Sequence, residues 1–324
     1  MEQFEGKIAV ITGGGTGMGR ELARQLSAAG CHVAMCDVSA DDMADTKALC
    51  DSASPTGTRV TTHLADVSDE EQISAFRDAV VAAHCPDRPH IDLLFNNAGI
   101  GGGGSFVSDD RAAWERTFNI CWGGVYLCSR VFLPLLVASE SARIINTSSV
   151  NGFWASLGPG QSHTAYSAAK FAVKGFSEAL ITDLRLTAPH VKVSVVMPGH
   201  IGTSIVINSH RAHGADPKEL TAEQIDGIRR RLAGQGIDLG GVSDEDIRLG
   251  VQAQAESFRD NAPMSAAAAA TVILDGVRAG RWRILVGDDA HRLDELVRAD
   301  PESAYDPVFE ERLRDASIMG FTRP

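Results

Sequence analysis

Tyr166 and Lys170 stand four residues apart, a spacing that places two side chains on the same face of a helix. A free tyrosine has a pKa near 10, so only about 0.1% of it is ionised at pH 7. A neighbouring ammonium group and a bound cation favour the phenolate in a partly desolvated site. Tyr166 could then be the general base in alcohol oxidation, or the general acid in ketone reduction. The alternative is a pair on a helix surface with no chemical role.

Two further polar residues could take part in the same chemistry. Ser149 ends an apolar, strand-like run, and a hydroxyl at the carboxyl end of a strand can hydrogen-bond a substrate oxygen. Asn119 lies within a long helical pattern, where a buried amide must find hydrogen-bond partners. Both residues are therefore candidates for a polar site around Tyr166.

A glycine-rich segment, Thr12–Gly19 (TGGGTGMG), follows the first apolar run and opens a helical pattern. Gly13 allows a sharp turn, Gly17 lets the backbone approach a pyrophosphate, and Gly19 lets the helix pack close to a sheet. The helix N-terminus adds amide donors and the positive end of its dipole. A flexible turn is the alternative, but the position between strand and helix favours a dinucleotide site.

Asp37 ends the second predicted strand, 18 residues after Gly19. A carboxylate at that point can accept hydrogen bonds from the adenosine ribose diol and would repel a 2′-phosphate. Proteins that bind this phosphate usually place an Arg or Lys beside it, whereas Val38 and Ser39 are neutral. The sequence therefore favours NAD over NADP, with a helix N-cap as the alternative role for Asp37.

These residues must be positioned by strands and helices that alternate along the chain. Short runs rich in Val, Ile and Leu predict strands at Lys7–Thr12, His32–Asp37, Arg59–Leu64, Ile91–Phe95, Arg143–Thr147, Lys192–Met197 and Arg283–Val286. Helical periodicity predicts helices at Gly17–Ala29, Ala40–Ser52, Asp69–Ala83, Arg111–Val137, Tyr166–Arg185 and Ala266–Ala279, with Pro134 expected to kink or end the fourth. This alternation predicts a doubly wound α/β Rossmann fold, a three-layer sandwich around a seven-stranded parallel sheet.

Two more motifs follow predicted strands. Asp66 and Val67 come after the third strand, where the adenine would lie, and Asn97, Ala98 and Gly99 close the fourth. Ligands bind at this carboxyl edge in doubly wound sheets. A structural turn is the alternative for the paired asparagines, and both roles can hold together.

The chain is expected to be a single Rossmann-type domain over residues 1–324 with two additions. Residues 204–263, called the lid below, are polar, with helical patterns at Ala222–Leu232 and Asp244–Phe258. Residues 300–324 form a tail with a short charged helix. The composition of neither predicts a core of its own.

Charge and composition restrict the partners and the compartment. The net charge of −12 argues against nucleic acid, and neither a polybasic run nor an apolar run of about 20 residues indicates a membrane partner. Six scattered cysteines without CxxC spacing predict reduced thiols, and the N-terminus lacks a signal pattern, so we expect a cytoplasmic protein. No metal is expected, because the histidines lack ligand spacing; those considered were His163, His200, His210 and His213.

Taken in order, these motifs resemble the short-chain dehydrogenase/reductase family, in its compact rather than its extended branch. The match runs over about residues 5–203, with weaker similarity at 265–287. Each motif is common, and their order makes the match specific. The pieces are Thr12–Gly19, Asp37, Asp66-Val67, Asn96–Gly99, Asn119, Ser149, Tyr166, Lys170, Pro198-Gly199, Ile201 and Thr203.

The resemblance implies a role for each catalytic candidate. Tyr166 is the acid/base, Lys170 lowers its pKa and binds the nicotinamide ribose, Ser149 orients the substrate oxygen, and Asn119 holds a water that relays protons to Lys170. Ser149 is preferred to Ser148, because two small or apolar residues and a glycine usually follow the family's serine. The cofactor-binding residues it implies are Gly13, Thr16, Gly17, Met18, Gly19, Asp37, Asp66, Val67, Asn97, Ala98, Gly99, Tyr166, Lys170, Pro198, Gly199, Ile201 and Thr203.

The chain departs from the family pattern between Ser149 and Tyr166, which are 17 residues apart, a few more than usual. The extra residues fall within 153–164 and can loop out. We expect three segments to wall the substrate pocket: 100–106, 151–164 with Phe153, Trp154 and Leu157, and the lid. A large lid and aromatic residues predict a bulky, lipophilic alcohol or ketone, steroid-like or aryl.

The family also implies a homodimer or homotetramer. Two other functions are less consistent with these motifs. A non-catalytic NAD-binding regulator would not need the Ser, Tyr, Lys and Asn candidates. An epimerase or dehydratase of the extended branch typically has a different glycine spacing. The leading expectation is thus an NAD-dependent oxidoreductase that interconverts a secondary alcohol and a ketone.

Overall fold

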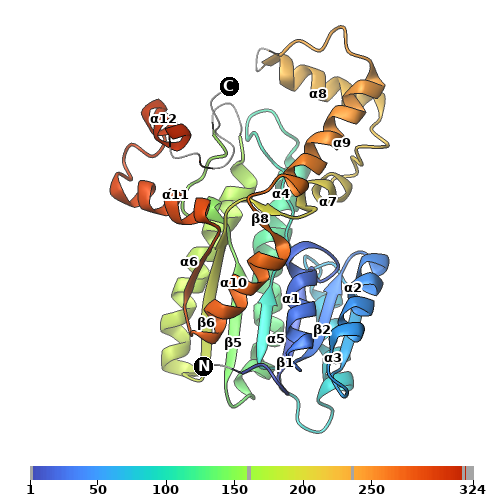
Figure 1. Ribbon diagram of the computed structural model, residues 1–324, viewed down its shortest axis with the longest axis vertical. Coiled ribbons are helices and arrows are strands. Elements are labelled where there is room, and N and C mark those ends of the chain that lie inside the picture. Colours follow the sequence, from blue (N-terminus) through green and yellow to red (C-terminus); the bar gives the residue numbers. More distant parts are fainter. Residues whose placement is uncertain (1–2, 159–161, 235–236, 316–317, 319–324) are drawn as a thin grey trace.

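The computed structural model describes residues 3–158, 162–234, 237–315 and 318. A seven-stranded sheet runs through the middle of the molecule, with helices on both faces (Figure 1). All neighbouring strands are parallel, in the order β3-β2-β1-β4-β5-β6-β9. The strands are β1 Ile8–Thr12, β2 His32–Asp37, β3 Val60–Leu64, β4 Leu93–Asn96, β5 Ala142–Thr147, β6 Val191–Pro198 and β9 Arg283–Val286. The predicted doubly wound Rossmann fold is confirmed.

The strand order reverses between β1 and β4, which lie side by side although they are far apart in the chain. Ligands of doubly wound sheets bind outside the carboxyl ends of the strands at this reversal. The predicted site residues follow β1, β2, β3, β4, β5 and β6, and all these strands point the same way. The topology therefore brings these segments to one edge of the sheet.

Two apolar cores, one on each face, hold the helices against the sheet. In β1, Ile8 and Val10 belong to one core, while Ala9 and Ile11 belong to the other, as the alternation of side chains along a strand requires. The first core takes side chains from α3, α5 and α6, and the second from α1, α2 and α10. These helices are α1 Gly17–Ala28, α2 Ala40–Ala53, α3 Glu70–His84, α5 Gly124–Val137, α6 Thr164–Thr187 and α10 Ala266–Arg278.

The long helix predicted over residues 111–137 forms, but it is not regular. It consists of α4 Arg111–Phe118, a π-helical turn at Asn119–Gly123, and α5. In the π turn the Gly124 N–H donates to the Asn119 carbonyl, five residues back. Pro134 lies inside α5 and does not end it. The irregularity thus lies at the π turn rather than at the proline.

The same helix corrects the expectation that no apolar stretch approaches membrane-spanning length. Over Arg111–Val137 the helix is long and apolar enough to cross a membrane by length and composition. Of its most apolar window, 56% is buried inside the fold, and Phe132 and Leu136 of α5 lie in the first core. Its apolar composition therefore reflects packing against the sheet.

The lid forms α7 Ile205–Ala212, α8 Ala222–Gly234 and α9 Asp244–Asp260. A short parallel pair, β7 Ile201–Gly202 and β8 Met264–Ser265, joins its two ends at the sheet. Helices α8 and α9 project away from the sheet at the end of the molecule opposite the N-terminus (Figure 1). Contrary to expectation, the lid has a small core of its own, in which Leu220, Ile225 and Ile247 are buried.

The C-terminal region contains α11 Asp288–Ala299 and α12 Pro307–Asp315. No helix was predicted for residues 288–299. Both helices lie at the same end of the molecule as the lid (Figure 1). A third apolar cluster joins them to the segment that follows β5, with Trp154, Leu293, Phe309 and Leu313 as its larger members. The tail is thus packed against the body of the same chain.

Candidate functional site

The glycine-rich turn after β1 is too tightly packed for any other residue at its key positions. Gly13 and Gly17 have positive φ angles of 67° and 55°, a region that favours glycine. A Cβ on Gly19 would lie 1.9 Å from the Gly13 carbonyl oxygen, so only glycine lets α1 start this close to the turn. Met18 packs against the second core, which fixes the first turn of α1. The backbone is thus shaped as a phosphate cradle requires.

Thr12 joins the ends of β1 and β4. Its hydroxyl oxygen accepts hydrogen bonds from the backbone N–H groups of Asn97 and Ala98, both at 3.0 Å. The Asn97 side chain donates to the carbonyls of Thr12 and Gly13. Asn97 and Ala98 therefore hold the turn in place, which is the structural role left open by the sequence.

Asp37 ends β2 with its carboxylate turned back toward the glycine-rich turn. One oxygen accepts from the Gly15 N–H at 2.9 Å, and the other accepts from the N–H groups of Val38 and Ser39. Burial raises the pKa of Asp37, and these three hydrogen bonds oppose that rise. Ser39, not Asp37, caps α2, because its side chain accepts from the Asp42 N–H. The N-cap alternative for Asp37 is therefore wrong.

The other predicted cofactor residues lie along the same edge. Asp66 follows β3, and its carboxylate accepts from the backbone and side chain of Ser68, while Val67 is buried against Gly124 of α5. Gly99 lies beside Lys170, since a Cβ on it would come within 3.5 Å of the Lys170 Nζ. The positions of Asp37, at the end of β2, and of Gly99 and Lys170, near the end of β5, fit the two ends of one elongated ligand along this edge.

The segment after β6 completes this edge. A Cβ on Gly199 would lie 2.2 Å from the Asp289 carboxylate, so glycine is required after Pro198. Thr203 lies opposite the glycine-rich turn, because a Cβ on Gly17 would lie 3.2 Å from the Thr203 Cβ. Ile201 is 4% exposed and begins the short β7 strand. Thr203 thus packs directly against the glycine-rich turn at Gly17.

Tyr166, Lys170 and Ser149 meet at the carboxyl end of β5. Tyr166 and Lys170 lie in the first two turns of α6, with the Lys170 Nζ 5.3 Å from the centre of the Tyr166 ring. Lys170 is 3% exposed and donates to the Thr147 carbonyl at 2.8 Å. Ser149 hydrogen-bonds the Tyr166 side chain. The three residues therefore form one buried polar centre.

The electrostatics of this centre depend on burial. Burial raises the pKa of Tyr166, and the hydrogen bond with Ser149 acts in the opposite direction. Burial also lowers the pKa of Lys170. Burial thus acts against the charged form of each group, and a positive charge bound beside Tyr166 would favour the phenolate.

Ser148 and Ser149 have separate tasks. The Ser148 hydroxyl donates to the Lys170 carbonyl at 2.8 Å, and a Cβ on Gly152 would lie 2.2 Å from its oxygen, so Ser148 is enclosed by α6. The Ser149 oxygen accepts from the Asn151 N–H at 3.1 Å, and it interacts with Tyr166. This arrangement supports Ser149 rather than Ser148 as the serine of the site.

Cys121, which was not predicted, takes the position expected for Asn119. The Asn119 side chain is exposed, whereas Cys121 is fully buried with its Sγ beside Gly99 and close to Lys170 and Tyr166. Its thiol donates to the Ile100 carbonyl at 3.1 Å, and burial raises its pKa. The described contacts therefore bring Cys121, and not Asn119, to the Tyr–Lys pair.

The periodicity of the helix could have revealed Cys121. Cys121, Val125, Cys128 and Phe132 recur at helical spacing and all are buried. Asn119 lies two residues before this stripe and therefore falls outside it. Residue type suggested Asn119, whereas helical phase indicates Cys121.

The run of glycines at 101–104 holds the start of α6. The carbonyls of Gly103 and Gly104 accept from the N–H groups of Ala165 and Thr164, both at 3.0 Å. A Cβ on Gly103 would lie 2.6 Å from the Ala165 Cβ, so the loop can approach α6 only as glycine. This loop satisfies free N–H groups in the first turn of α6 and thereby positions Tyr166.

His163 packs against Tyr166, with their ring centres 4.6 Å apart and their planes tilted by 35°. Burial lowers the pKa of His163 to about 4, so its imidazole is neutral at physiological pH. A neutral imidazole can both donate and accept a hydrogen bond. His163 is thus a second polar ring at the site, which the sequence suggested only as a lid or surface residue.

The first lid helix contacts both sides of the site. The Asn208 side chain donates to the Thr16 hydroxyl at 3.1 Å, which joins α7 to the glycine-rich turn. The Gly101 N–H donates to the Ser209 hydroxyl at 2.7 Å, and the His213 ring hydrogen-bonds the Gly101 carbonyl. Helix α7 therefore spans from the cofactor side to the loop in front of α6.

The aromatic residues expected in the substrate wall lie elsewhere. Trp154 is 2% exposed and packs on Phe309, with ring centres 5.8 Å apart. Phe153 lies under the Arg283 guanidinium and in the cluster with the C-terminal helices. The expectation that both rings line the pocket is wrong, because they anchor the C-terminal region. Part of the expected wall, residues 159–161, lies outside the described residues.

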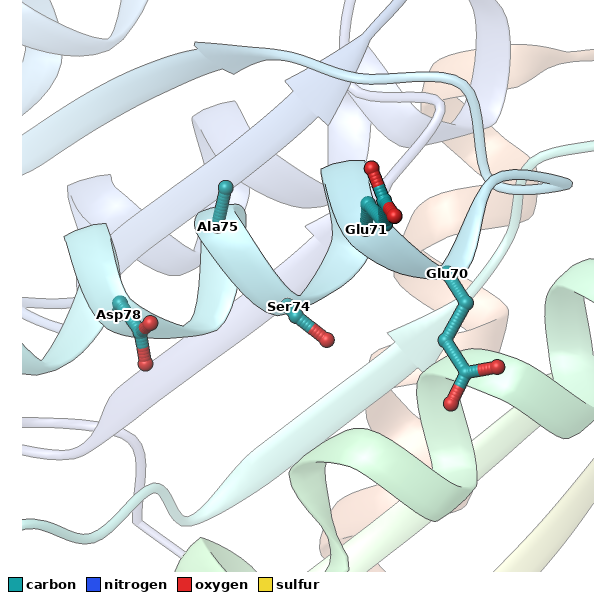
Figure 2. Close-up of a pocket in the computed structure, with 5 residues that line it drawn as sticks. All are labelled: Glu70, Glu71, Ser74, Ala75 and Asp78. Atoms are coloured by element: carbon teal, nitrogen blue, oxygen red, sulfur yellow. The ribbon is translucent and has the colours of Figure 1, made fainter.

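A shallow pocket on the outside of α3 is not a candidate site. Figure 2 shows its five lining residues on one helix, and three of them are carboxylates: Glu70, Glu71, Ser74, Ala75 and Asp78. None belongs to the set around Tyr166. A cluster of like charges that are open to solvent offers nothing to fix a ligand, so we assign it no function.

Comparison with known proteins identifies the family. Residues 7–213 match the family model described as short chain dehydrogenase, and the chain belongs to this family. A Mycobacterium tuberculosis (H37Rv) protein named SadH, a provisionally assigned oxidoreductase, is 36% identical over 92% of both chains. Levodione reductase of Leifsonia aquatica is 31% identical over 68% of this chain and 79% of its own.

A solved structure is similar over nearly the whole chain. The short-chain dehydrogenase/reductase of Burkholderia phymatum in complex with NAD is 28% identical, covers 95% of this chain and 98% of its own, and has a TM-score of 0.74. The chain is therefore a short-chain dehydrogenase/reductase and an oxidoreductase.

Proposed function

We propose that this protein is an NAD-dependent dehydrogenase that interconverts a secondary alcohol and a ketone, with Tyr166 as acid/base. The observation that carries the proposal is the buried meeting of Tyr166, Ser149 and Lys170 beside Gly99, at the carboxyl edge of the sheet. A binding protein needs a cradle for the nucleotide, but it does not need a partly buried tyrosine next to a buried lysine.

The proton chemistry follows from these contacts. A nicotinamide held by Lys170, Ile201 and Thr203 would supply the acceptor for a hydride from the alcohol carbon, or the donor of a hydride to the ketone carbon. In oxidation, the alcohol oxygen transfers its proton to the Tyr166 Oη while Ser149 hydrogen-bonds the same substrate oxygen. Lys170 holds positive charge beside Tyr166 and favours the phenolate. In reduction, Tyr166 returns the proton to the oxygen.

We further propose that NAD is preferred to NADP. The Asp37 carboxylate sits at the end of β2 and is partly buried, where a 2′-phosphate would bring two negative charges beside it. Its hydrogen bonds with Gly15, Val38 and Ser39 fix its orientation. The solved relative from Burkholderia phymatum is in complex with NAD.

The proposed substrate is a bulky, lipophilic alcohol or ketone. The support is the extent of the lid and its position, since α7 reaches both the glycine-rich turn and Gly101. Because Phe153 and Trp154 do not line the wall, the proposal rests on the lid and no longer on these two aromatic side chains. Turnover of small polar polyols alone would contradict this proposal.

We propose a homodimer or homotetramer in the cytoplasm. Three large apolar side chains, Tyr126 and Val137 of α5 and Phe171 of α6, are more than 40% exposed on the helices that follow the π turn and carry Tyr166. A second copy of the chain would bury such a face. All six cysteines are free and buried, which suits a reducing compartment. Light scattering of the purified protein tests the assembly.

The decisive experiment measures nucleotide reduction in the ultraviolet, with NAD and NADP in parallel, against secondary alcohols from small aliphatic to steroidal. Tyr166→Phe is the control. We expect NAD-linked turnover that this variant loses. Tight NAD binding without turnover on any alcohol would instead favour a regulatory protein.

A further inference from the structure

We propose that the C-terminal segment formed by residues 304–315 and Ile318, called the clamp, positions Ser149 by holding Trp154. The clamp does not contribute an atom to the site, so it acts through the loop that follows Ser149. The inference deepens the proposed function, because its catalytic readout requires that function, whereas its structural readout does not.

A series of hydrogen bonds connects Ser149 to the clamp. The Asn151 N–H donates to the Ser149 hydroxyl oxygen at 3.1 Å, and the Asn151 side chain donates to the Trp154 carbonyl at 3.0 Å. The Trp154 indole N–H then donates to the Ala304 carbonyl at 2.7 Å. Next to it, the Ala155 N–H donates to the Tyr305 hydroxyl at 3.0 Å. Asn151 thus links Ser149 to Trp154, and the clamp holds Trp154 and Ala155 through Ala304 and Tyr305.

Apolar packing seals this connection. Trp154 and Val150 are 2% exposed, and they share a cluster with Phe309 and Leu313 of α12 and with Ile318. The Phe309 ring packs on the indole itself, with ring centres 5.8 Å apart. Without the clamp, Trp154 would be exposed, and the turn would keep only its local hydrogen bonds.

The preceding helix holds the other side of the site in a similar way. Asp289 of α11 accepts from the His200 N–H at 2.7 Å, and its carboxylate fills the space next to Gly199. Helix α11 also contacts the turn that follows Ser149. The C-terminal region therefore touches both the serine turn and the segment expected at the nicotinamide.

The consequence for Tyr166 is specific. The Ser149 hydroxyl lowers the Tyr166 pKa through its hydrogen bond, against the effect of burial. If the clamp is loosened, Ser149 loses its fixed orientation, the Tyr166 pKa rises, and alcohol oxidation needs a higher pH. The glycine-rich turn makes none of these contacts, so the affinity for the nucleotide is expected to stay the same.

The experiment uses the full-length protein with Phe309→Ala, which removes the ring that packs on Trp154. Phe309→Leu keeps an apolar side chain at this position and serves as the conservative variant. Val308→Ala is the matched control, because Val308 lies next to it on α12 and is 51% exposed. Trp154→Phe is the second variant, since it removes the hydrogen bond to Ala304 and keeps an aromatic ring.

The structural readout is hydrogen–deuterium exchange over residues 148–156, with residues 12–19 as internal reference. The catalytic readout is kcat with NAD and a secondary alcohol across pH, in the wild type and in a Ser149→Ala background. We expect faster exchange over 148–156 only, a loss of kcat of about 10- to 100-fold in Phe309→Ala, and a shift of its pH profile to higher pH. Phe309→Leu should restore most of this loss.

The double variant separates positioning from general destabilisation. Phe309→Ala should cause little further loss in the Ser149→Ala background, because the serine on which the clamp acts is already absent. An equal loss in both backgrounds, or unchanged exchange over 148–156, would overturn the proposal. If Phe309→Ala exchanges faster over 148–156 than the wild type does, and the wild type turns over no alcohol, the result supports the clamp and counts against the proposed reaction.

Discussion

Two regions of the molecule are held by different kinds of contact. One is the carboxyl edge of the sheet, where the glycine-rich turn lies. The other, called the cover, is formed by the lid and the clamp. At the edge, backbone meets backbone: the Gly13 carbonyl lies where a Cβ of Gly19 would be, and Ala98 packs against Gly13. In the cover, side chains reach across, as Asn208 does to Thr16 and Trp154 to Ala304. A backbone contact cannot adjust to an added side chain, whereas a side-chain contact can be shortened or exchanged. Single substitutions at the edge should therefore cause a large loss of stability and NAD binding, and substitutions in the cover a small one.

The largest effect is expected at Tyr166, which lies between the edge and the cover. Tyr166→Phe removes the proton donor and acceptor and keeps the ring that packs against His163. We expect kcat to fall by about 1000-fold, which corresponds to about 4 kcal/mol. Affinity for NAD should change little. Stopped-flow turnover and nucleotide titration measure the two quantities, and a variant that keeps most of its kcat would remove Tyr166 from the mechanism.

A pair of glycine substitutions tests the contrast between edge and cover. Gly19→Ala places a methyl group 1.9 Å from the Gly13 carbonyl oxygen, so we expect a loss of unfolding free energy of about 2–4 kcal/mol and of NAD binding. Gly250→Ala in α9 of the lid meets no atom within 4 Å and should stabilise by about 0.5–1 kcal/mol, because alanine favours a helix. Urea denaturation compares them. Equal effects at the two sites would contradict the distinction.

A smaller effect is expected where the lid touches the edge. Asn208→Ala deletes the hydrogen bond to Thr16, whose net value is about 0.5–1.5 kcal/mol. NAD should then bind about 3- to 10-fold more weakly, because α7 no longer holds the glycine-rich turn to which the cofactor binds. Asn261→Ala, which removes a hydrogen bond to Ser257 at the C-terminal end of α9, is the matched control. Fluorescence titration that finds both variants unchanged would exclude α7 as a latch on the cofactor.

The smallest effect lies far from both regions and depends on pH. Burial lowers the pKa of His84 to about 4, below the value of about 6.5 expected in the unfolded chain. As the pH falls below 6.5, the unfolded chain takes up the proton first, so stability decreases until about pH 4. With allowance for solvent screening, this amounts to about 1 kcal/mol at pH 5.

Urea denaturation at pH 7.5 and pH 5 measures this effect in the wild type and in His84→Leu. The variant should lose less stability between the two pH values, because the buried imidazole is gone. His163 and His32, whose pKa values burial also lowers, remain in both proteins, so the difference reports the removal of His84. An equal loss in both proteins would contradict the prediction.

Local patterns were sufficient for most of the central fold. The apolar runs of β1, β2 and β6 and the glycines of the first turn follow from side-chain alternation and from backbone geometry, which act over a few residues. Helical phase was misjudged at one point only. The π turn at Asn119–Gly123 adds a residue to the helix, and Cys121, rather than Asn119, faces Lys170.

The contacts of the cover could not be read from local patterns. Trp154 and Phe309 are 155 residues apart, and nothing near either of them in the sequence indicates that they meet. For the same reason, Trp154 was expected to line the pocket. Gly103 and Gly104 were assigned to the pocket wall, although their carbonyls hold the first turn of α6.

By itself, the sequence determined the order of strands and helices, the phosphate cradle and the candidates Tyr166, Lys170 and Ser149, because each depends on spacing within a turn or a helix. Only the tertiary structure decided that Cys121 lies at the Tyr–Lys pair, that α7 contacts the cradle, and that the tail packs behind Ser149. These contacts join segments far apart in the chain, and they arise because the parallel strands end at one edge, where long connections must pack against one another.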